Sequence, residues 1–372
     1  MKFSCDQIVL SKALSIVSKA VSSRTTVPVL KSILLEAKED NTLKLSASDL
    51  DFSIQKTIDA DVKDPGSIAV NAKLFSDIVR KMPEDMYFEV DENGKVSIQT
   101  HYSTFNIVGT PASDFPGIAD IEEPEDTLSF NKQIFTEMIR KTGFCASIDE
   151  TRGVLVGILM ELEENAFHMV ALDGFRMAVA NEVMTNKEPK KIVVNAKILG
   201  EVNKIIIESG IQEEEDVQLI LGDKKAVILL DRTKIVMRLM DGEFINYKEI
   251  LPKENSTIIE VWRKDFLGAV ERASLLAKEG RNNLITCNIT DKGMDITSNS
   301  EEGNVKEYVG VKKEGKDIEI GFNSKYIEDA LKVIEDEHVK MEFNTSITPC
   351  LIKPVEGDQF TYLVLPVRIP SR

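Results

Sequence analysis

The sequence predicts an α+β fold built from three similar domains in tandem, and three sets of recurring residues support this prediction. Asn71, Asn195 and Asn323 each precede a helix-like segment, at intervals of 124 and 128 residues. Two further sets recur at intervals of 124–129 residues: Asp49, Asp173 and Asn299, and Leu30, Leu155 and Leu284. A period of this length corresponds to a whole domain, because solenoid units are only about 20–50 residues long.

Each copy contains two segments with helical periodicity. Near the start of the chain, Val9, Ala13 and Val17 recur at four-residue steps, which predicts a helix with one apolar face. The first helices are predicted at 5–22, 131–146 and 262–279, and the second helices at 72–82, 196–208 and 324–335.

Short stretches between the helices alternate between apolar and polar residues, which is typical of half-buried β-strands. They lie at 43–47, 96–98, 294–296 and 339–343. Two acidic stretches without periodicity, at 122–126 and 252–256, separate the copies. We therefore expect domains at 1–126, 127–254 and 255–372.

The composition excludes several classes of protein. No run of apolar residues approaches the roughly 18 needed to span a membrane. The N-terminus has no signal-peptide pattern, and the four cysteines are scattered. We expect a cytoplasmic protein with buried, reduced thiols.

The sequence contains none of the motifs that commonly mark catalytic or cofactor sites. A phosphate-binding loop, a GxGxxG fingerprint and a GxSxG elbow are all missing, and the three histidines lack zinc-site spacing. We therefore expect no catalytic residue, no metal site and no cofactor.

Positive charge gathers on the predicted helices, although the chain has a net charge of −16. Four pairs of basic residues are seven positions apart, which is two helical turns and places each pair on one helix face. The pairs are Lys12 and Lys19, Lys73 and Arg80, Lys197 and Lys204, and Lys325 and Lys332. A single pair is most simply a solvated face, but the repetition favours a surface that meets phosphate.

Several short motifs resemble one known family in both composition and order. They are MKF at the start, Arg24 ahead of Pro28-Val29-Leu30, SDFP at 113–116, DGFR at 173–176, Tyr247 with Leu251-Pro252, and LPVR at 365–368. Together they resemble the bacterial DNA sliding clamp, the β subunit of the replicative DNA polymerase III, and the resemblance covers essentially the whole chain.

The resemblance implies a DNA clamp fold, in which each domain has two helices packed on antiparallel sheets. It also implies a head-to-tail homodimeric ring that encircles duplex DNA independently of sequence and acts as a processivity factor. The implied partners are the replicative polymerase, a clamp loader and other proteins that carry a clamp-binding motif. Arg24, Lys73 and Lys197 correspond to positions associated with DNA contact, and the other basic pairs are expected to face the DNA with them.

The resemblance implies two protein-binding surfaces. Phe105 and Ile107 of the first domain are expected to meet Leu275 and Leu276 of the third domain of a second copy, although all four could instead be core residues. A groove for partner peptides is expected between domains two and three. Its residues would be Leu155, Leu172, Gly174, Phe175, Arg176, Met177, Ile245, Ile250, Asn323, Tyr326, Ile347, Leu363, Leu365, Pro366, Val367 and Arg368.

The groove departs from the family pattern at Phe175, Ile245 and Glu249, where familiar members carry His, Pro and Arg. We therefore expect a more apolar floor and a more acidic rim.

The sequence also leaves two other functions open. An enzyme could use an interdomain cleft of the tripled α+β fold, and an acidic scaffold could bind only proteins.

Overall fold

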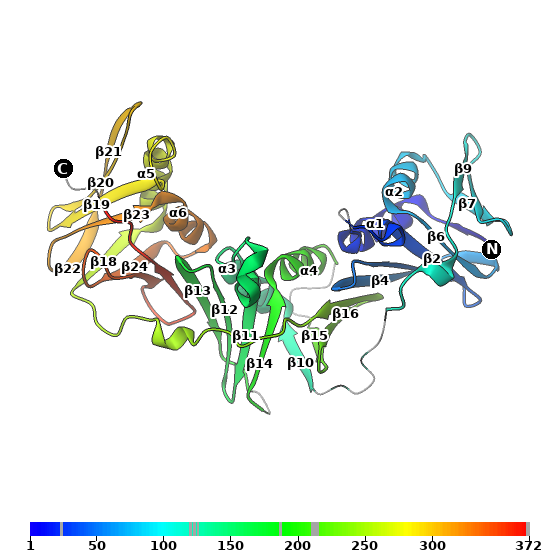
Figure 1. Cartoon of the computed structure of the whole chain (residues 1–372), viewed down its shortest axis with the longest axis horizontal. Helices are drawn as coiled ribbons and strands as arrows, with labels where there is room; N and C mark the ends of the chain where they lie inside the picture. Colours follow the sequence, from blue (N-terminus) through cyan, green and yellow to red (C-terminus); the bar gives the residue numbers. More distant parts are fainter. Residues whose placement is uncertain are drawn as a thin grey trace. The chain divides into compact units, whose positions relative to one another are not determined.

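The computed structural model describes residues 1–22, 25–118, 121, 124, 126–185, 188–209 and 216–369. The chain forms two compact units, and Figure 1 labels their helices and strands. Unit 1 comprises Met1–Phe135 and Glu201–Leu239, and unit 2 comprises Thr136–Gly200 and Met240–Arg372. The chain passes from one unit to the other within two of its helices and again after residue 239.

Unit 1 contains two antiparallel sheets, with strand orders β5-β1-β7-β8-β9 and β10-β15-β16-β17-β4-β3-β2-β6. The helices α1 (Gln7–Val17) and α2 (Ala72–Lys81) lie side by side and pack against strands of the larger sheet. The strands are β1 (Lys2–Cys5), β2 (Ser32–Lys38), β3 (Thr42–Ser48), β4 (Phe52–Asp59), β5 (Asp61–Asp64), β6 (Gly66–Asn71), β7 (Met86–Val90), β8 (Lys95–Gln99), β9 (Thr104–Val108), β10 (Asp126–Asn131), β15 (Asp216–Leu221), β16 (Lys225–Leu230) and β17 (Thr233–Arg238).

Unit 2 also contains two antiparallel sheets, with strand orders β14-β11-β12-β13-β26-β25-β24-β18-β22 and β21-β20-β19-β23. The helices α5 (Arg263–Ala277) and α6 (Ser324–Val333) pack against each other. The strands are β11 (Gly157–Glu163), β12 (Ala166–Leu172), β13 (Arg176–Glu182), β14 (Lys190–Asn195), β18 (Thr257–Trp262), β19 (Leu284–Thr290), β20 (Gly293–Ser300), β21 (Gly303–Val309), β22 (Val311–Gly315), β23 (Ile318–Asn323), β24 (His338–Phe343), β25 (Cys350–Pro354) and β26 (Phe360–Val364).

All six predicted helices are confirmed, with ends that differ by a few residues. They are α1 (Gln7–Val17), α2 (Ala72–Lys81), α3 (Lys132–Gly143), α4 (Ala196–Glu208), α5 (Arg263–Ala277) and α6 (Ser324–Val333). The four stretches of alternating residues are also confirmed as strands, in β3, β8, β20 and β24. The α+β class predicted from these patterns is therefore correct.

The recurring asparagines are helix caps. The Oδ1 atom of Asn71 accepts a hydrogen bond from the Leu74 N–H at 3.0 Å, at the start of α2. Asn195 accepts from the Lys197 N–H at 2.9 Å, and Asn323 accepts from the Lys325 N–H at 3.0 Å. The first backbone N–H groups of a helix have no partner within the helix, so an asparagine is favoured at each of these positions.

The recurring aspartates shape the turns between paired strands. Asp49 accepts hydrogen bonds from the Asp51 and Phe52 N–H groups between β3 and β4. Asp173 accepts from the Phe175 and Arg176 N–H groups between β12 and β13. The third copy differs, because Asn299 lies within β20 and faces Asn304 of β21.

Strand pairing continues across both of the expected domain boundaries. In unit 1, β17 pairs with β4, and in unit 2, β13 pairs with β26. The 122–126 stretch lies mostly outside the described residues, whereas 252–256 carries neither helix nor strand.

The four cysteines are buried and free, as expected for reduced thiols. In the part of the chain that the structure describes, no helix combines the length and apolar character needed to cross a bilayer.

Replacing Asn71 with Ala removes the cap of α2 and is expected to lower the free energy of unfolding by about 1 kcal/mol. Asn71→Asp keeps an acceptor oxygen and is the matched control. Urea denaturation followed by circular dichroism measures both variants. An equal loss of stability in the two variants would contradict the capping role.

Candidate functional site

A buried apolar cluster in unit 2 contains several of the residues predicted for the partner groove. Leu172, Met177 and Leu363 belong to this cluster, together with Tyr247 and Leu351. Partly exposed side chains pack against it: Leu155, Met240, Phe244, Leu251 and Leu365. Five of the predicted groove residues therefore lie where a core reaches the surface, as is typical of surfaces that bind apolar anchors.

Tyr247 is hydrogen-bonded to the buried carboxylate of Glu161, a residue that no sequence motif identified. Its hydroxyl donates a hydrogen bond to Glu161 Oε2 at 2.7 Å. Lys191 and Lys248 lie 2.8 Å and 3.3 Å from the Glu161 carboxylate. Burial opposes ionisation of Glu161, but hydrogen bonds from Lys191, Tyr247 and Lys248 outweigh it and lower its pKa to about 2.

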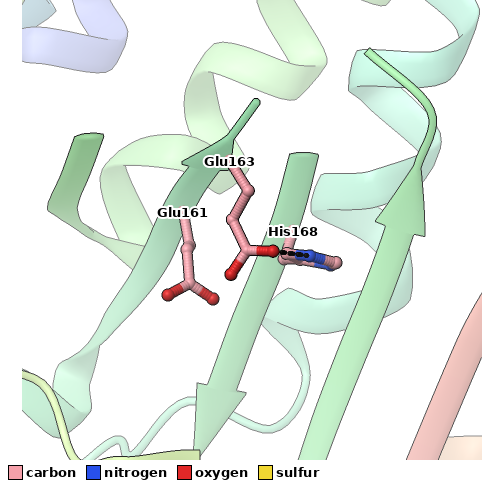
Figure 2. A group of neighbouring side chains, drawn as sticks. All are labelled: Glu161, Glu163 and His168. Atoms are coloured by element: carbon pink, nitrogen blue, oxygen red, sulfur yellow. Dashed lines mark ion pairs between the residues drawn. The ribbon is translucent and has the colours of Figure 1, made fainter. Parts of the chain in front are cut away.

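Glu161, Glu163 and His168 bring three possible metal ligands together on β11 and β12 (Figure 2). The His168 Nε2 atom lies 3.7 Å from Glu163, and its Nδ1 atom is 2.7 Å from the Asn181 side-chain oxygen. Lys248 forms ion pairs with both carboxylates. Because two lysines already neutralise these acids, a cation would have to displace them, and the cluster does not fit a metal site.

One sign of this cluster is present in the sequence. Glu161 interrupts an otherwise apolar run in β11 and lies opposite His168 in the strand pairing. A charged residue in a buried strand requires a partner. The partners themselves come from distant segments, which no short motif identifies.

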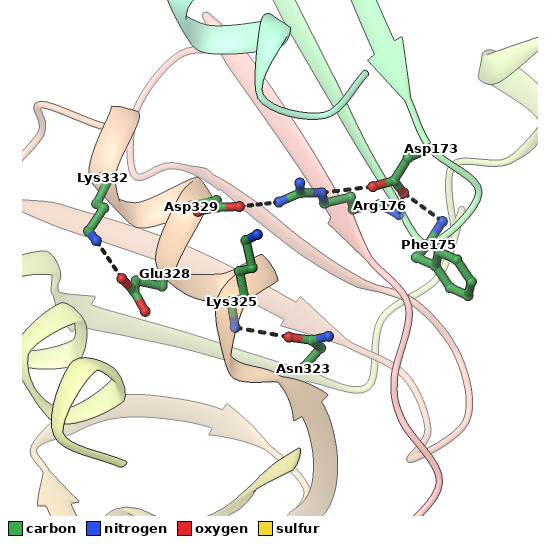
Figure 3. Close-up of polar contacts among 8 residues, drawn as sticks. All are labelled: Asp173, Phe175, Arg176, Asn323, Lys325, Glu328, Asp329 and Lys332. Carbon is green, nitrogen blue, oxygen red and sulfur yellow. Dashed lines mark hydrogen bonds and ion pairs between the residues drawn. The ribbon is translucent and has the colours of Figure 1, made fainter. Parts of the chain in front are cut away.

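Arg176 is the polar centre of the candidate site (Figure 3). Its Nε atom donates to Asp173 at 3.0 Å, and its NH1 atom donates to Asp329 of α6 at 2.7 Å. Only 10% of the Arg176 side chain is exposed. Because the guanidinium is buried between two carboxylates, it ties the turn after β12 to helix α6.

Two aromatic rings lie beside Arg176. The Phe175 and Tyr326 rings are stacked, with centroids 6.3 Å apart. The Arg176 guanidinium carbon lies 4.6 Å from the Tyr326 centroid, within the range of a cation–π contact. Phe175 itself is 53% exposed, so the expected apolar character at this position is present at the surface.

The segment after β26 is fixed to this surface by backbone hydrogen bonds. The Leu365 N–H donates to the Phe175 carbonyl at 2.9 Å, and the Val367 N–H donates to the Gly321 carbonyl at 2.8 Å. Gly174 has a φ of +92°, which favours glycine at this turn. Pro366 is half-buried and Arg368 is exposed.

The remaining predicted groove residues are mostly exposed. Ile245, Ile250 and Ile347 are 44%, 40% and 82% exposed. Asn323 has a structural role as the α6 cap. Glu249 accepts a hydrogen bond from the Asn246 side chain at 2.8 Å, so an acidic group does lie beside Ile245 and Ile250.

The predicted basic pairs contain two kinds of residue. Lys19 lies 3.5 Å from Glu208, Lys204 lies 2.8 Å from Glu201, and Arg80 lies 3.7 Å from Asp77. Lys332 forms ion pairs with Glu328 and Glu271. The other four are exposed and make no ion pair among the described residues: Lys12, Lys73, Lys197 and Lys325.

One expected pairing on a helix face is wrong. Helix α1 ends at Val17, and Lys19 lies in the following 3₁₀ turn, Ser18–Ala20. Lys12 and Lys19 are therefore not two turns apart on one α-helix. Arg24 lies outside the described residues.

The residues predicted for subunit contact differ in exposure. Phe105 is 42% exposed on β9, which forms one edge of its sheet, but Ile107 is only 9% exposed and belongs to the core. Leu275 of α5 is 66% exposed, and Leu276 is half-buried. The side chains open to a partner are therefore chiefly Phe105 and Leu275.

Comparison with protein families gives three matches along the chain. Residues 1–119 match the N-terminal domain of the DNA polymerase III beta subunit, residues 129–246 match its central domain, and residues 248–368 match its C-terminal domain.

Individual relatives agree with these matches. A beta sliding clamp from Staphylococcus aureus is 32% identical over 362 residues, which cover 94% of each chain. A solved putative DNA polymerase III beta subunit from Eubacterium rectale is 37% identical, with a TM-score of 0.93 and 99% of each chain covered. The sliding clamp from Bacillus subtilis is 31% identical, with a TM-score of 0.94 over the whole of both chains. The chain therefore belongs to the family of the DNA polymerase III beta subunit, the bacterial sliding clamps.

Proposed function

We propose that this protein is a sliding clamp without enzymatic activity, which encircles duplex DNA as a homodimeric ring and tethers the replicative polymerase. The observation that carries the proposal is the match of all three domains, in order, to the beta subunit family. The comparisons give no support to the alternative of an enzyme with an interdomain cleft. A cytoplasmic location is proposed from the same role.

The proposed contact with DNA is loose and independent of sequence. The candidate surface consists of lysines and arginines on helices, which can meet phosphates. A ring held on DNA by its topology needs only weak contacts, and weak contacts permit sliding. The acidic charge of the whole chain would disfavour DNA binding elsewhere on the surface.

The partner peptide is proposed to bind over the apolar cluster of unit 2. Leu155 and Leu365 lie partly exposed on that cluster, and the exposed Phe175 stacks on the half-buried Tyr326 beside it. Such a surface suits a short peptide with aliphatic or aromatic anchors. The polymerase, the clamp loader and other clamp-motif proteins would share it.

We further propose the domain limits 1–126, 127–254 and 255–372, and a head-to-tail contact between the first and third domains of two copies. A closed ring of two identical chains requires such a heterologous contact. A clamp loader is included because a closed ring must be opened before it can surround DNA.

The topological role is tested with the full-length protein loaded by its clamp loader onto nicked circular DNA. The clamp is expected to remain on the circle during gel filtration and to dissociate after the DNA is linearised, because a ring slides off a free end. Equal retention on both forms of DNA would overturn the proposal.

The peptide surface is tested with the variant Leu365→Ala/Pro366→Ala. Truncation of two side chains at the apolar surface is expected to reduce polymerase stimulation about tenfold or more, since anchor residues dominate such contacts. Val183→Ala, at a residue that is 86% exposed on unit 2, is the control. Full stimulation by the double variant, with an unchanged solution mass, would show that the surface is misassigned.

The subunit contact is tested with Leu275→Asp. Because Leu275 is 66% exposed in the single chain, the substitution should leave the fold intact but place a charge in the interface. Light scattering is expected to give the mass of a monomer for this variant and of a dimer for Val183→Asp. A dimeric Leu275→Asp protein would refute this interface.

A further inference from the structure

The second helices of the three copies share a pattern of charged residues. Two positions after each capping asparagine lies a lysine: Lys73, Lys197 and Lys325. Six positions after the cap lies an acidic residue, and nine positions after it lies a basic one. The acidic residues are Asp77, Glu201 and Asp329, and the basic residues are Arg80, Lys204 and Lys332.

The basic residues at the two positions have different surroundings. Arg80 and Lys204 lie 3.7 Å and 2.8 Å from the acidic residues three positions before them. In the third copy Asp329 is bound to Arg176, and Lys332 pairs with the neighbouring Glu328 instead. The lysines two positions after the cap make no ion pair among the residues that the structure describes, and in Figure 3 the dashed line at Lys325 joins its backbone N–H to Asn323.

Glu201 is the most heavily engaged of these acids. Its carboxylate lies 2.8 Å from Lys204 and 3.9 Å from Lys19, and Glu208 lies 3.5 Å from the same Lys19. Two lysines and two glutamates thus form a group with no net charge. Such a group attracts phosphate far less than the same two lysines alone.

Helix stability does not account for the unpaired lysines. Each lies in the first turn of its helix, where the macrodipole disfavours a positive side chain. A lysine placed there in all three copies, without an acidic partner in the described part of the chain, is better explained by a ligand outside the chain.

We infer that the acids paired with the basic residues nine positions after each cap, Asp77, Glu201 and Glu328, weaken the grip on DNA by neutralising those cations, with the largest effect at Glu201, and leave the phosphate contacts to the lysines two positions after each cap. This inference rests on the proposed function and assigns different roles to residues within its DNA-facing surface. The consequence is a grip limited to a few phosphates, so that the clamp can slide.

The test compares two double variants that both keep the net charge of −16. Glu201→Gln/Lys204→Gln removes an ion pair of helix α4. Lys197→Gln/Asp223→Asn removes an unpaired lysine of the same helix together with an exposed acid in the turn between β15 and β16. The binding constant is measured over a range of salt concentrations by fluorescence anisotropy. The probe is a labelled linear duplex, which can enter the ring from a free end.

The Lys197→Gln/Asp223→Asn variant is expected to bind about threefold more weakly than the wild type. Its dependence of log K on log salt should be shallower by about 0.9 for each phosphate that the variant no longer neutralises. The Glu201→Gln/Lys204→Gln variant should match the wild type. Equal weakening in both variants, or weakening only in Glu201→Gln/Lys204→Gln, would overturn the inference.

A single substitution that is expected to tighten DNA binding provides an independent test. Glu201→Gln alone frees Lys204, whereas Lys19 keeps its pairing with Glu208, and the variant is expected to bind DNA about threefold more tightly, with a steeper salt dependence. Asp223→Asn alone makes the same change in net charge and should have a smaller effect. Equal effects of Glu201→Gln and Asp223→Asn would overturn the inference, because net charge rather than the ion pairs of Glu201 would then determine the affinity for DNA.

Retention of the wild type on nicked circular DNA separates the two proposals. If the wild type is not retained, the clamp function itself fails. If it is retained and the variants behave otherwise than expected, only the assignment of the lysines fails.

Discussion

Backbone hydrogen bonding between β13 and β26 is the constraint on which the candidate partner surface depends. This pairing sets Met177 opposite Leu363 and places Arg176 opposite Val364. The same nine-stranded sheet therefore supplies both the turn that carries Phe175 and the segment that carries Leu365. The side chains above the sheet can form one apolar cluster because the strands below them are joined without a break.

Arg176 adds the polar counterpart of this constraint. Its guanidinium contacts the turn through Asp173 and helix α6 through Asp329, and it lies beside the Tyr326 ring. Helix α6 thus takes part in two surfaces. Tyr326 contributes to the candidate peptide surface, while Lys325 next to it is exposed and belongs to the candidate DNA surface.

The effect of a charged residue in this protein depends on its local partners more than on the net charge of the chain. An acidic chain carries basic helices, and acids within those helices neutralise part of the positive charge. The buried Glu161 shows the same principle in the core, where Lys191, Lys248 and Tyr247 compensate one carboxylate. In both places, the partners determine what a charged residue can do.

The sequence alone determined the repeat, the six helices, the α+β class and the family, because caps, hydrophobic periodicity and short ordered motifs are local signals. Asn71, Asn195 and Asn323 could be recognised as equivalent before their capping role was known. Only the tertiary structure decided that Lys19 lies beyond α1, that Ile107 is buried, and that Lys204 is ion-paired whereas Lys197 has no ion-pair partner among the described residues. These properties depend on where a helix ends and on which side chains from other segments lie nearby, and sequence spacing does not contain that information.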